Sequence, residues 1–155
     1  MNNKKICCFY ISTYHLFTII LPYINEKIKE GKNVELLLQK DLSDDLKRYV
    51  KNVKSLNLDV NKIINLGWNR NGEITEKNNN VDYIIVGDEI FISNYENIMI
   101  ENEINSDVLS CYKMNNNLEI SKVLLGHDEL LTTRRLKTIS KFSQNEQKRK
   151  TIKSQ

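Results

Sequence analysis

Chain-breaking residues are scarce in this sequence. Its 155 residues include one proline and five glycines, which favours a chain dominated by regular helices and strands. No Gly-x-Gly-x-x-Gly pattern follows the first apolar segment, and no Gly-Lys-Ser/Thr motif occurs. These absences disfavour a dedicated dinucleotide or P-loop nucleotide site. The remaining composition, 40% hydrophobic and 28% charged, is ordinary for a soluble globular domain.

Cysteine is also rare. Cys7, Cys8 and Cys111 have no metal-ligand spacing, and their odd number argues against a disulfide framework. We expect buried, reduced thiols in a cytosolic protein and no metal site. The apolar segment 6–24 is interrupted by Ser12 to His15, so it predicts neither a signal peptide nor a membrane-spanning helix.

Positive charge is concentrated at the end of the chain. Residues 132–155 hold eight Lys or Arg and one acid, a net charge of +7, so the rest of the chain carries −4 of the total of +3. Residues 143–155 contain almost no apolar side chains and are predicted to be a disordered tail, whereas residues 1–142 are expected to form one domain. The tail lacks interleaved aromatics, so we expect no nucleic-acid partner. Contact of the tail with the anionic inner face of a membrane is a hypothesis.

Strand-like and helix-like apolar patterns alternate along the chain. A continuous apolar run within 4–11 predicts a strand buried on both faces, and apolar residues at helical spacing predict a helix over 13–30 that ends at Gly31. The same reasoning predicts strands at 34–39, 60–66, 81–86 and 118–125 and helices at 43–56, 92–103 and 130–142, while 108–112 fits either a helix end or a short strand. This alternation predicts an α/β fold, a Rossmann-like parallel sheet with helices on both faces.

Three of the predicted strands are followed by polar clusters: Ser12 to His15, Asp88-Glu89, and His127 to Glu129. Because the carboxyl ends of parallel strands share one edge of a sheet, we expect the three clusters to line one cleft.

The first two clusters each fit a structural role as well. Ser12 and Thr13 fit a helix N-cap as well as a turn that holds a sugar or phosphate oxygen. His15 fits a structural hydrogen-bonding residue, and Asp88 and Glu89 fit the start of a helix.

The third cluster, which follows Gly126, points more specifically to catalysis than the other two clusters do. A carboxylate at 127–129 could deprotonate a hydroxyl group as a general base if burial or a neighbouring acid raised its pKa. It could equally belong to a polar loop that caps the next helix. Arg134 and Arg135 fit contacts with an anionic ligand or a solvated basic surface.

The opening segment, Ile-Cys-Cys-Phe-Tyr-Ile-Ser-Thr-Tyr-His-Leu at 6–16, resembles the start of bacterial surface-glycan glycosyltransferases. The nearest families are the lipooligosaccharide sialyltransferases and the capsular polysialyltransferases, which place a Thr-Pro-Tyr/Leu-His/Gln-Leu-like turn after their first strand. Here Ser-Thr-Tyr-His-Leu stands in that place without the proline. The segments 84–89 and 124–135 are also similar to family strands, although His127 replaces the first acid of an acidic pair and Glu129 replaces a glycine.

This resemblance implies the N-terminal, acceptor-side lobe of a GT-B glycosyltransferase that transfers a sugar to a cell-surface glycan. Asp128 matches the catalytic acid and would activate an acceptor hydroxyl group, with His127 or Glu129 tuning or replacing it. The substrate-binding residues would be Ser12, Thr13, His15, Asp88, Glu89, Thr133 and Arg134.

The resemblance also implies the partners of such a lobe. The acceptor would be an oligosaccharide or glycolipid. The donor would be a nucleotide sugar such as CMP-sialic acid, held by a second lobe, with no further cofactor. The chain is too short to contain that lobe, so we expect little transferase activity from it alone, in the cytoplasm or peripherally on the inner membrane.

Two other functions fit the same pattern. One is a lobe of a glycerophosphate or phosphosugar transferase of the teichoic-acid type. The other is a non-enzymatic, Rossmann-like interaction module with a basic tail.

Overall fold

A computed structural model of the chain describes residues 3–53, 57–69, 74, 80–133 and 136–139. Within these residues the centre of the fold is a six-stranded sheet in the order β2-β3-β4-β1-β5-β6. The strands are β1 Lys5–Tyr10, β2 Asn33–Leu38, β3 Val81–Gly87, β4 Val108–Lys113, β5 Glu129–Leu131 and β6 Leu136–Thr138. Each neighbouring pair from β2 to β5 is parallel, and β6 is antiparallel to β5.

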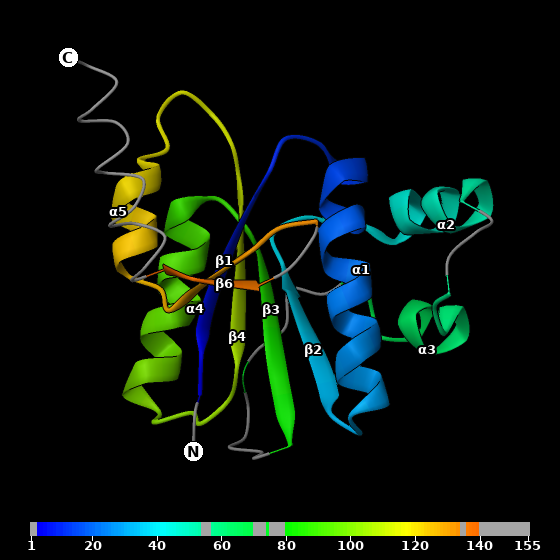
Figure 1. The fold of residues 1–155 in the computed structure, drawn as a ribbon, viewed down its shortest axis with the longest axis horizontal. Coiled ribbons are helices and arrows are strands. Elements are labelled where there is room, and N and C mark those ends of the chain that lie inside the picture. Colours follow the sequence, from blue (N-terminus) through cyan, green and yellow to red (C-terminus); the bar gives the residue numbers. More distant parts are fainter. Residues whose placement is uncertain (1–2, 54–56, 70–73, 75–79, 134–135, 140–155) are drawn as a thin grey trace.

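Helices cover both faces of this sheet (Figure 1). They are α1 Thr13–Lys29, α2 Ser43–Asn52, α3 Val60–Ile64, α4 Glu89–Glu101 and α5 Ile120–Leu125. One apolar core joins α1, α2 and α3 to one face, and a second core joins α4 and α5 to the other. The predicted Rossmann-like α/β fold is therefore confirmed.

Alternate side chains of the central strands supply the two cores. In β1, Ile6 and Cys8 pack toward α1, while Cys7 packs toward α4, as the two-residue period of a strand requires. Cys7, Cys8 and Cys111 are buried free thiols, as predicted. Burial raises the pKa of the Cys7 thiol to about 12, so this thiol is a packing group rather than a nucleophile.

Two predicted strands are helices instead. The segment expected as a strand at 60–66 contains α3, which Asp59 caps by accepting a hydrogen bond from the amide of Lys62. The segment expected as a strand at 118–125 contains α5. In both segments the apolar residues recur at helical spacing, and each run is too short to distinguish the two periods by eye.

The segment after α5 also differs from the prediction. In place of the helix expected at 130–142, β5 and β6 form an antiparallel pair, with Leu131 opposite Leu136. Residues 140–142 and the predicted disordered tail at 143–155 lie outside the described residues.

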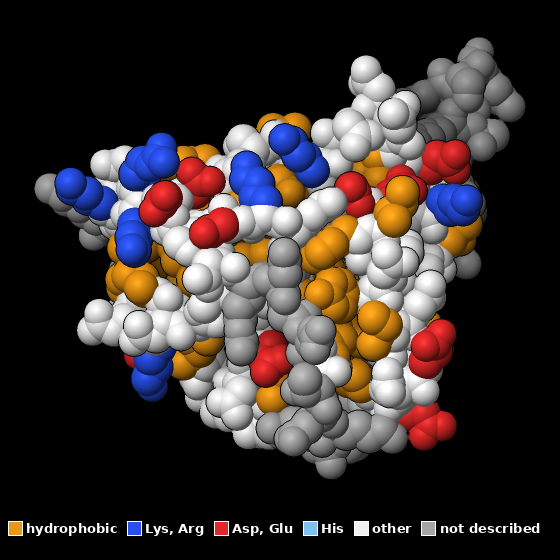
Figure 2. Space-filling model, turned by 180° about the vertical axis from the view of Figure 1, so that it is seen from behind, with side chains coloured by type: hydrophobic (Ala, Val, Ile, Leu, Met, Phe, Trp, Pro, Cys, Tyr) orange, Lys and Arg blue, Asp and Glu red, His pale blue; other side chains and the backbone are white. Residues whose placement is uncertain are grey.

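Apolar side chains gather in a band on the face seen in Figure 2. On α4, Phe91, Tyr95 and Ile98 line a hollow of about 440 Å³ together with Ile74. Ile90, on the same helix, is 75% exposed. The outer side of α4 is therefore more apolar than a solvent-facing helix surface requires.

Candidate functional site

The crevice at the carboxyl edge of the sheet is the first candidate site. β1 leads into α1 on one face, and its neighbour β4 leads into α5 on the other. Where neighbouring parallel strands send their connections to opposite faces, the loops separate and leave an opening for a ligand. A cavity of about 250 Å³ lies there, and its lining includes Thr13, Gln39, Lys40, Asp88 and Lys113.

The turn after β3 forms one wall of this crevice. Asp88 caps α4 by accepting a hydrogen bond from the amide of Phe91 at 2.9 Å. The Gln39 side chain donates to the other carboxylate oxygen of Asp88 at 3.0 Å and accepts from the Asp88 amide at 2.8 Å. The Phe91 amide and the Gln39 side chain hold the pKa of Asp88 below its usual range. Asp88 is therefore a fixed, ionised carboxylate with both oxygens engaged, which makes it a poor general base.

Glycine is required at the end of β3. A Cβ atom at Gly87 would lie 2.6 Å from Cδ1 of Phe91 and 2.8 Å from Oε1 of Gln39. Both distances are shorter than van der Waals contact. The missing side chain is what allows Gln39 to reach Asp88 across the end of β3.

The turn after β1 forms the opposite wall. Ser12 is the N-cap of α1, and its hydroxyl oxygen accepts from the His15 amide at 3.1 Å. His15 Nδ1 accepts from the Ile11 amide at 3.1 Å, which places the proton of a neutral imidazole on Nε2. Ser12 and His15 thus make the structural contacts that were expected as one alternative, their role in ligand binding stays a prediction, and Thr13 lines the cavity.

The charges around the crevice favour an anion. Lys40 follows β2 and Lys113 ends β4, and both side chains are exposed. The first turn of α1 contains no acidic residue, so the positive end of its dipole is not offset there. Asp88 is the one carboxylate among the described residues that line the cavity.

The predicted catalytic cluster lies at the opposite edge of the sheet. β5 begins at Glu129 and runs parallel to β1, with Ile6 paired to Glu129. His127, Asp128 and Glu129 therefore stand at the amino end of β5, whereas Thr13 and Asp88 stand at the carboxyl ends of β1 and β3. The expectation of one cleft for all three clusters is wrong, because a helix rather than a strand precedes His127.

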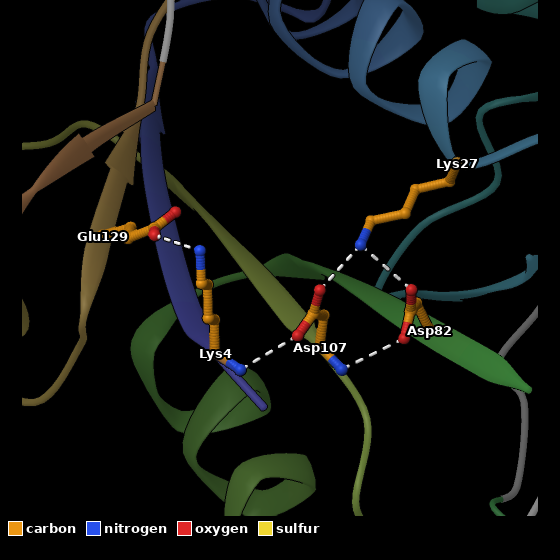
Figure 3. A network of polar contacts seen from close by, with 5 residues as sticks. All are labelled: Lys4, Lys27, Asp82, Asp107 and Glu129. Carbon is orange, nitrogen blue, oxygen red and sulfur yellow. Dashed lines mark hydrogen bonds and ion pairs between the residues drawn. The ribbon is translucent and has the colours of Figure 1, made fainter. Parts of the chain in front are cut away.

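Asp128 and Glu129 hold the start of β1 in place. Asp128 is exposed, and its carboxylate accepts from the Lys5 amide at 2.9 Å. Glu129 Oε1 lies 2.8 Å from the ammonium group of Lys4 (Figure 3). Both contacts are structural, and they leave the role of Asp128 as a catalytic base a prediction.

His127 is buried in a contact between α4 and the end of α5. Its Nδ1 lies 2.6 Å from the carbonyl oxygen of Val123, and its Nε2 lies 2.8 Å from Glu96 Oε2, which also accepts from Ser110 Oγ at 2.7 Å. Both ring nitrogens of His127 therefore lie within hydrogen-bond distance of an oxygen atom.

The electrostatics of Glu96 fit this arrangement. Burial by itself would raise the pKa of Glu96, but the hydrogen bonds from His127 and Ser110, together with the charge of His127, outweigh it. The pKa of Glu96 therefore lies below its usual range. This cluster ties α4, α5 and β4 together inside the second core.

The remaining predicted residues are scattered. Glu89 is the first residue of α4 and is exposed. Thr133 is exposed and lines a different cavity, which also contains Glu129. Arg134 lies outside the described residues. The structure thus brings Thr13 and Asp88 together in the crevice at the carboxyl edge and places Thr133 at the other cavity.

Sequence reasoning missed Gln39, Lys40, Glu96 and Lys113. The available signal for Gln39, Lys40 and Lys113 was their position at the carboxyl end of a strand, which is where α/β sheets bind ligands. Glu96 carried no such signal, because its partner His127 is 31 residues away in the chain.

Comparisons with protein-family models, curated proteins and solved structures found no match to this chain. Among the described residues there is no group of three or more His, Cys, Asp or Glu residues that could hold a metal ion. Within the same part of the chain, no helix has the length and apolar content needed to cross a membrane.

Proposed function

We propose that this chain is a ligand-binding α/β lobe whose crevice takes an anionic, hydroxylated small molecule such as an acidic sugar or a sugar phosphate. The observation that carries the proposal is the placement of Lys40, Lys113 and the first turn of α1 around a cavity at the carboxyl ends of β1, β2, β3 and β4. Ammonium groups and helix amides are suited to carboxylate or phosphate oxygens. The hydroxyl group of Thr13, and the second N–H of the Gln39 side chain beside the one donated to Asp88, offer hydrogen bonds to neutral hydroxyl groups.

The narrower form of this proposal is the acceptor-side lobe of a sialyltransferase-like glycosyltransferase. An acidic surface glycan has the carboxylates and hydroxyl groups that this lining suits. In that reaction the described crevice would bind and orient the acceptor, because its one carboxylate, Asp88, is engaged by Gln39 and Phe91. The base that deprotonates the acceptor would then come from outside this crevice, such as from a donor-binding lobe.

A phosphate-bearing acceptor is the second candidate. The same two lysines suit the phosphodiester of a glycerophosphate polymer, as expected for a lobe of the teichoic-acid type. The two lysines of the crevice suit both acceptors equally. Measuring which of the two acceptor types the chain binds distinguishes the candidates.

Thermal unfolding with added ligands tests the proposal. The probes are 3′-sialyllactose, neutral lactose, glycerol 3-phosphate and CMP. We expect stabilisation by sialyllactose but not by lactose, and a ligand at 100 times its dissociation constant adds roughly 2.7 kcal/mol. Stabilisation by glycerol phosphate alone would favour the second candidate.

Matched lysine variants locate the binding. Lys40→Gln and Lys113→Gln should each weaken sialyllactose binding about tenfold, which corresponds to loss of one charge-assisted hydrogen bond. Lys122→Gln, on the exposed side of α5, should leave the affinity for sialyllactose unchanged. Equal binding of lactose and sialyllactose, or equal effects of the three variants, would remove the basis of the proposal.

A further inference from the structure

A second cavity lies at the amino edge of the sheet, on the α1 face. It measures about 600 Å³ and is bounded by α1, β1 and the segment from β5 to β6. Ile6, Ile19 and Leu131 give it apolar walls. Its volume is within the range of small-molecule sites, and it is separate from the crevice at the carboxyl edge.

A network of five charged side chains borders this cavity (Figure 3), and four of them, Lys4, Lys27, Asp107 and Glu129, line it. Lys27 Nζ lies 3.0 Å from Asp82 and 2.7 Å from Asp107. The Lys4 ammonium group lies 2.8 Å from Oε1 of Glu129. The side chain of Lys4 is 45% exposed, so it can move aside at the edge of the cavity.

Two polar atoms at this end have no hydrogen-bond partner among the described residues. They are the hydroxyl group of Tyr23 and Oε2 of Glu129. Tyr23 is only 8% exposed and lines the cavity. Burial and the neighbouring charges of Asp107, Asp82 and Glu129 raise the pKa of Tyr23, so its hydroxyl group stays protonated close to these carboxylates. Buried polar groups are rarely left without partners, and this pair therefore points to a ligand.

The charge balance selects the kind of ligand. The described lining residues include four carboxylates, on Glu26, Glu30, Asp107 and Glu129, and two ammonium groups, on Lys4 and Lys27. An anion would be repelled by this excess of negative charge, whereas a cation would be attracted. When the Glu129 carboxylate is ionised, its Oε2 accepts hydrogen bonds and cannot donate one. The Tyr23 hydroxyl oxygen can also accept a hydrogen bond.

We propose that this cavity binds a primary amine with an apolar body, whose ammonium group donates to Glu129 Oε2 and to the Tyr23 hydroxyl. The other oxygen of the Glu129 carboxylate, Oε1, already contacts an ammonium group, that of Lys4. The amine would make the same kind of contact with Oε2. The apolar walls would cover the body of the ligand, and Pro22, which also lines the cavity, adds to them. This second site is independent of the proposed function at the carboxyl edge.

A pair of nearly isosteric probes tests the charge requirement. The probes are 2-phenylethylamine and 2-phenylethanol, titrated into the full chain and followed by the shifts of backbone amide signals in NMR spectra. We expect the amine to bind at least about tenfold more tightly than the alcohol, the usual effect of a charge-assisted hydrogen bond. Equal affinities, or no binding of the amine at millimolar concentration, would overturn the proposal.

Variants then assign the contacts. Glu129→Gln should weaken amine binding about tenfold, and Tyr23→Phe should weaken it several-fold while keeping the ring. Glu119→Gln, an exposed acid beside α5, is the matched control and should bind as the unaltered chain does. If Glu129→Gln does not fold, Tyr23→Phe still decides: unchanged affinity in that variant contradicts the proposed contact.

A lysine variant distinguishes amine binding in this cavity from binding in the crevice at the carboxyl edge. Arginine variants test whether side chains of the chain itself occupy the cavity. Lys40→Gln should not change the affinity for the amine, because Lys40 lines the carboxyl-edge crevice and not this cavity. The two proposed sites can therefore be refuted independently of each other. If the amine binds only when Arg134 and Arg135 are both changed to Gln, the chain's own guanidinium groups are the occupant and the proposal is wrong.

Discussion

Replacing Lys27 with methionine tests the energetics of the buried charge network. The change keeps most of the side-chain volume but removes the ammonium group that bridges Asp82 and Asp107. The side chains of Lys27, Asp82 and Asp107 are 13%, 6% and 21% exposed. Both carboxylates would thus lose their cationic partner in a place that water reaches poorly.

The expected loss of unfolding free energy is about 3 kcal/mol. Breaking a buried ion pair by removing one partner costs about 3–5 kcal/mol. The lower end applies here because each carboxylate keeps one hydrogen bond: Asp82 accepts from the Asp107 amide, and Asp107 accepts from the Lys4 amide. For a chain of this size such a loss lowers the melting temperature by about 6–12 °C.

Urea unfolding at pH 7 measures this change. Lys29→Met is the control on the same helix, because Lys29 and Glu26 form an exposed pair at 3.5 Å; its effect should stay within about 0.5 kcal/mol. Adding Asp82→Asn to Lys27→Met should restore at least about 1 kcal/mol, since one unpaired charge is removed. A loss below about 1 kcal/mol for Lys27→Met, or equal losses for the two lysine variants, would refute this reasoning.

Two further predictions concern the second core and the turn after β3. The pKa of Glu96 is lowered in the fold, so its stabilising contribution is present above the usual carboxyl pKa of about 4.3 and is lost as the pH falls through the lower folded value. The difference in unfolding free energy between the unaltered chain and Glu96→Gln, measured in urea, should therefore shrink below about pH 4; a difference that is constant from pH 7 to pH 3 would contradict the assignment. Gly87→Ala should cost about 1–3 kcal/mol, because the added methyl group meets Phe91 and Gln39 at 2.6 and 2.8 Å. Gly126→Ala, whose added methyl group would lie 3.7 Å from the carbonyl oxygen of Val123, is its control, and similar losses in both variants would rule out the packing argument.

The parts of the fold that the sequence predicts are those with long, unambiguous patterns. The continuous apolar run of β1 and the largely apolar segments of β2 and β3 identify buried strands. The left-handed backbone at Gly31, with φ of +78°, ends α1 where a glycine is expected to end it. These features are local, so the chain itself carries the information.

The errors arise in short segments that are predicted as strands because many of their residues are apolar, although the apolar residues recur at helical spacing. In α3 the apolar residues are Val60, Ile63 and Ile64, and in α5 the same spacing recurs from Ile120. That spacing favours a helix, but five or six residues is also the length of a strand. The 76% exposure of Leu125 shows that this run does not continue into the core.

One such error misplaced the candidate site. Interpreting α5 as a strand puts Asp128 at the carboxyl edge of the sheet, although it lies at the amino edge. The lysines of the crevice, Lys40 and Lys113, were missed because an isolated lysine near a strand end resembles any solvated residue. Only the strand order, which brings β2, β3, β4 and β1 together in that sequence, shows that the two face one cavity.

The central position of β1 has a consequence for synthesis of the protein. Its partner β4 begins at Val108, opposite Lys5, so about 100 residues must leave the ribosome before the first strand can pair. At roughly 5–20 residues per second this takes about 5–20 s. During that time β2 and β3 can already pair, whereas the apolar first strand, with two adjacent thiols, stays open to aggregation and oxidation. Slowing translation just before β4 should therefore lower the yield of native protein more than slowing it after β5.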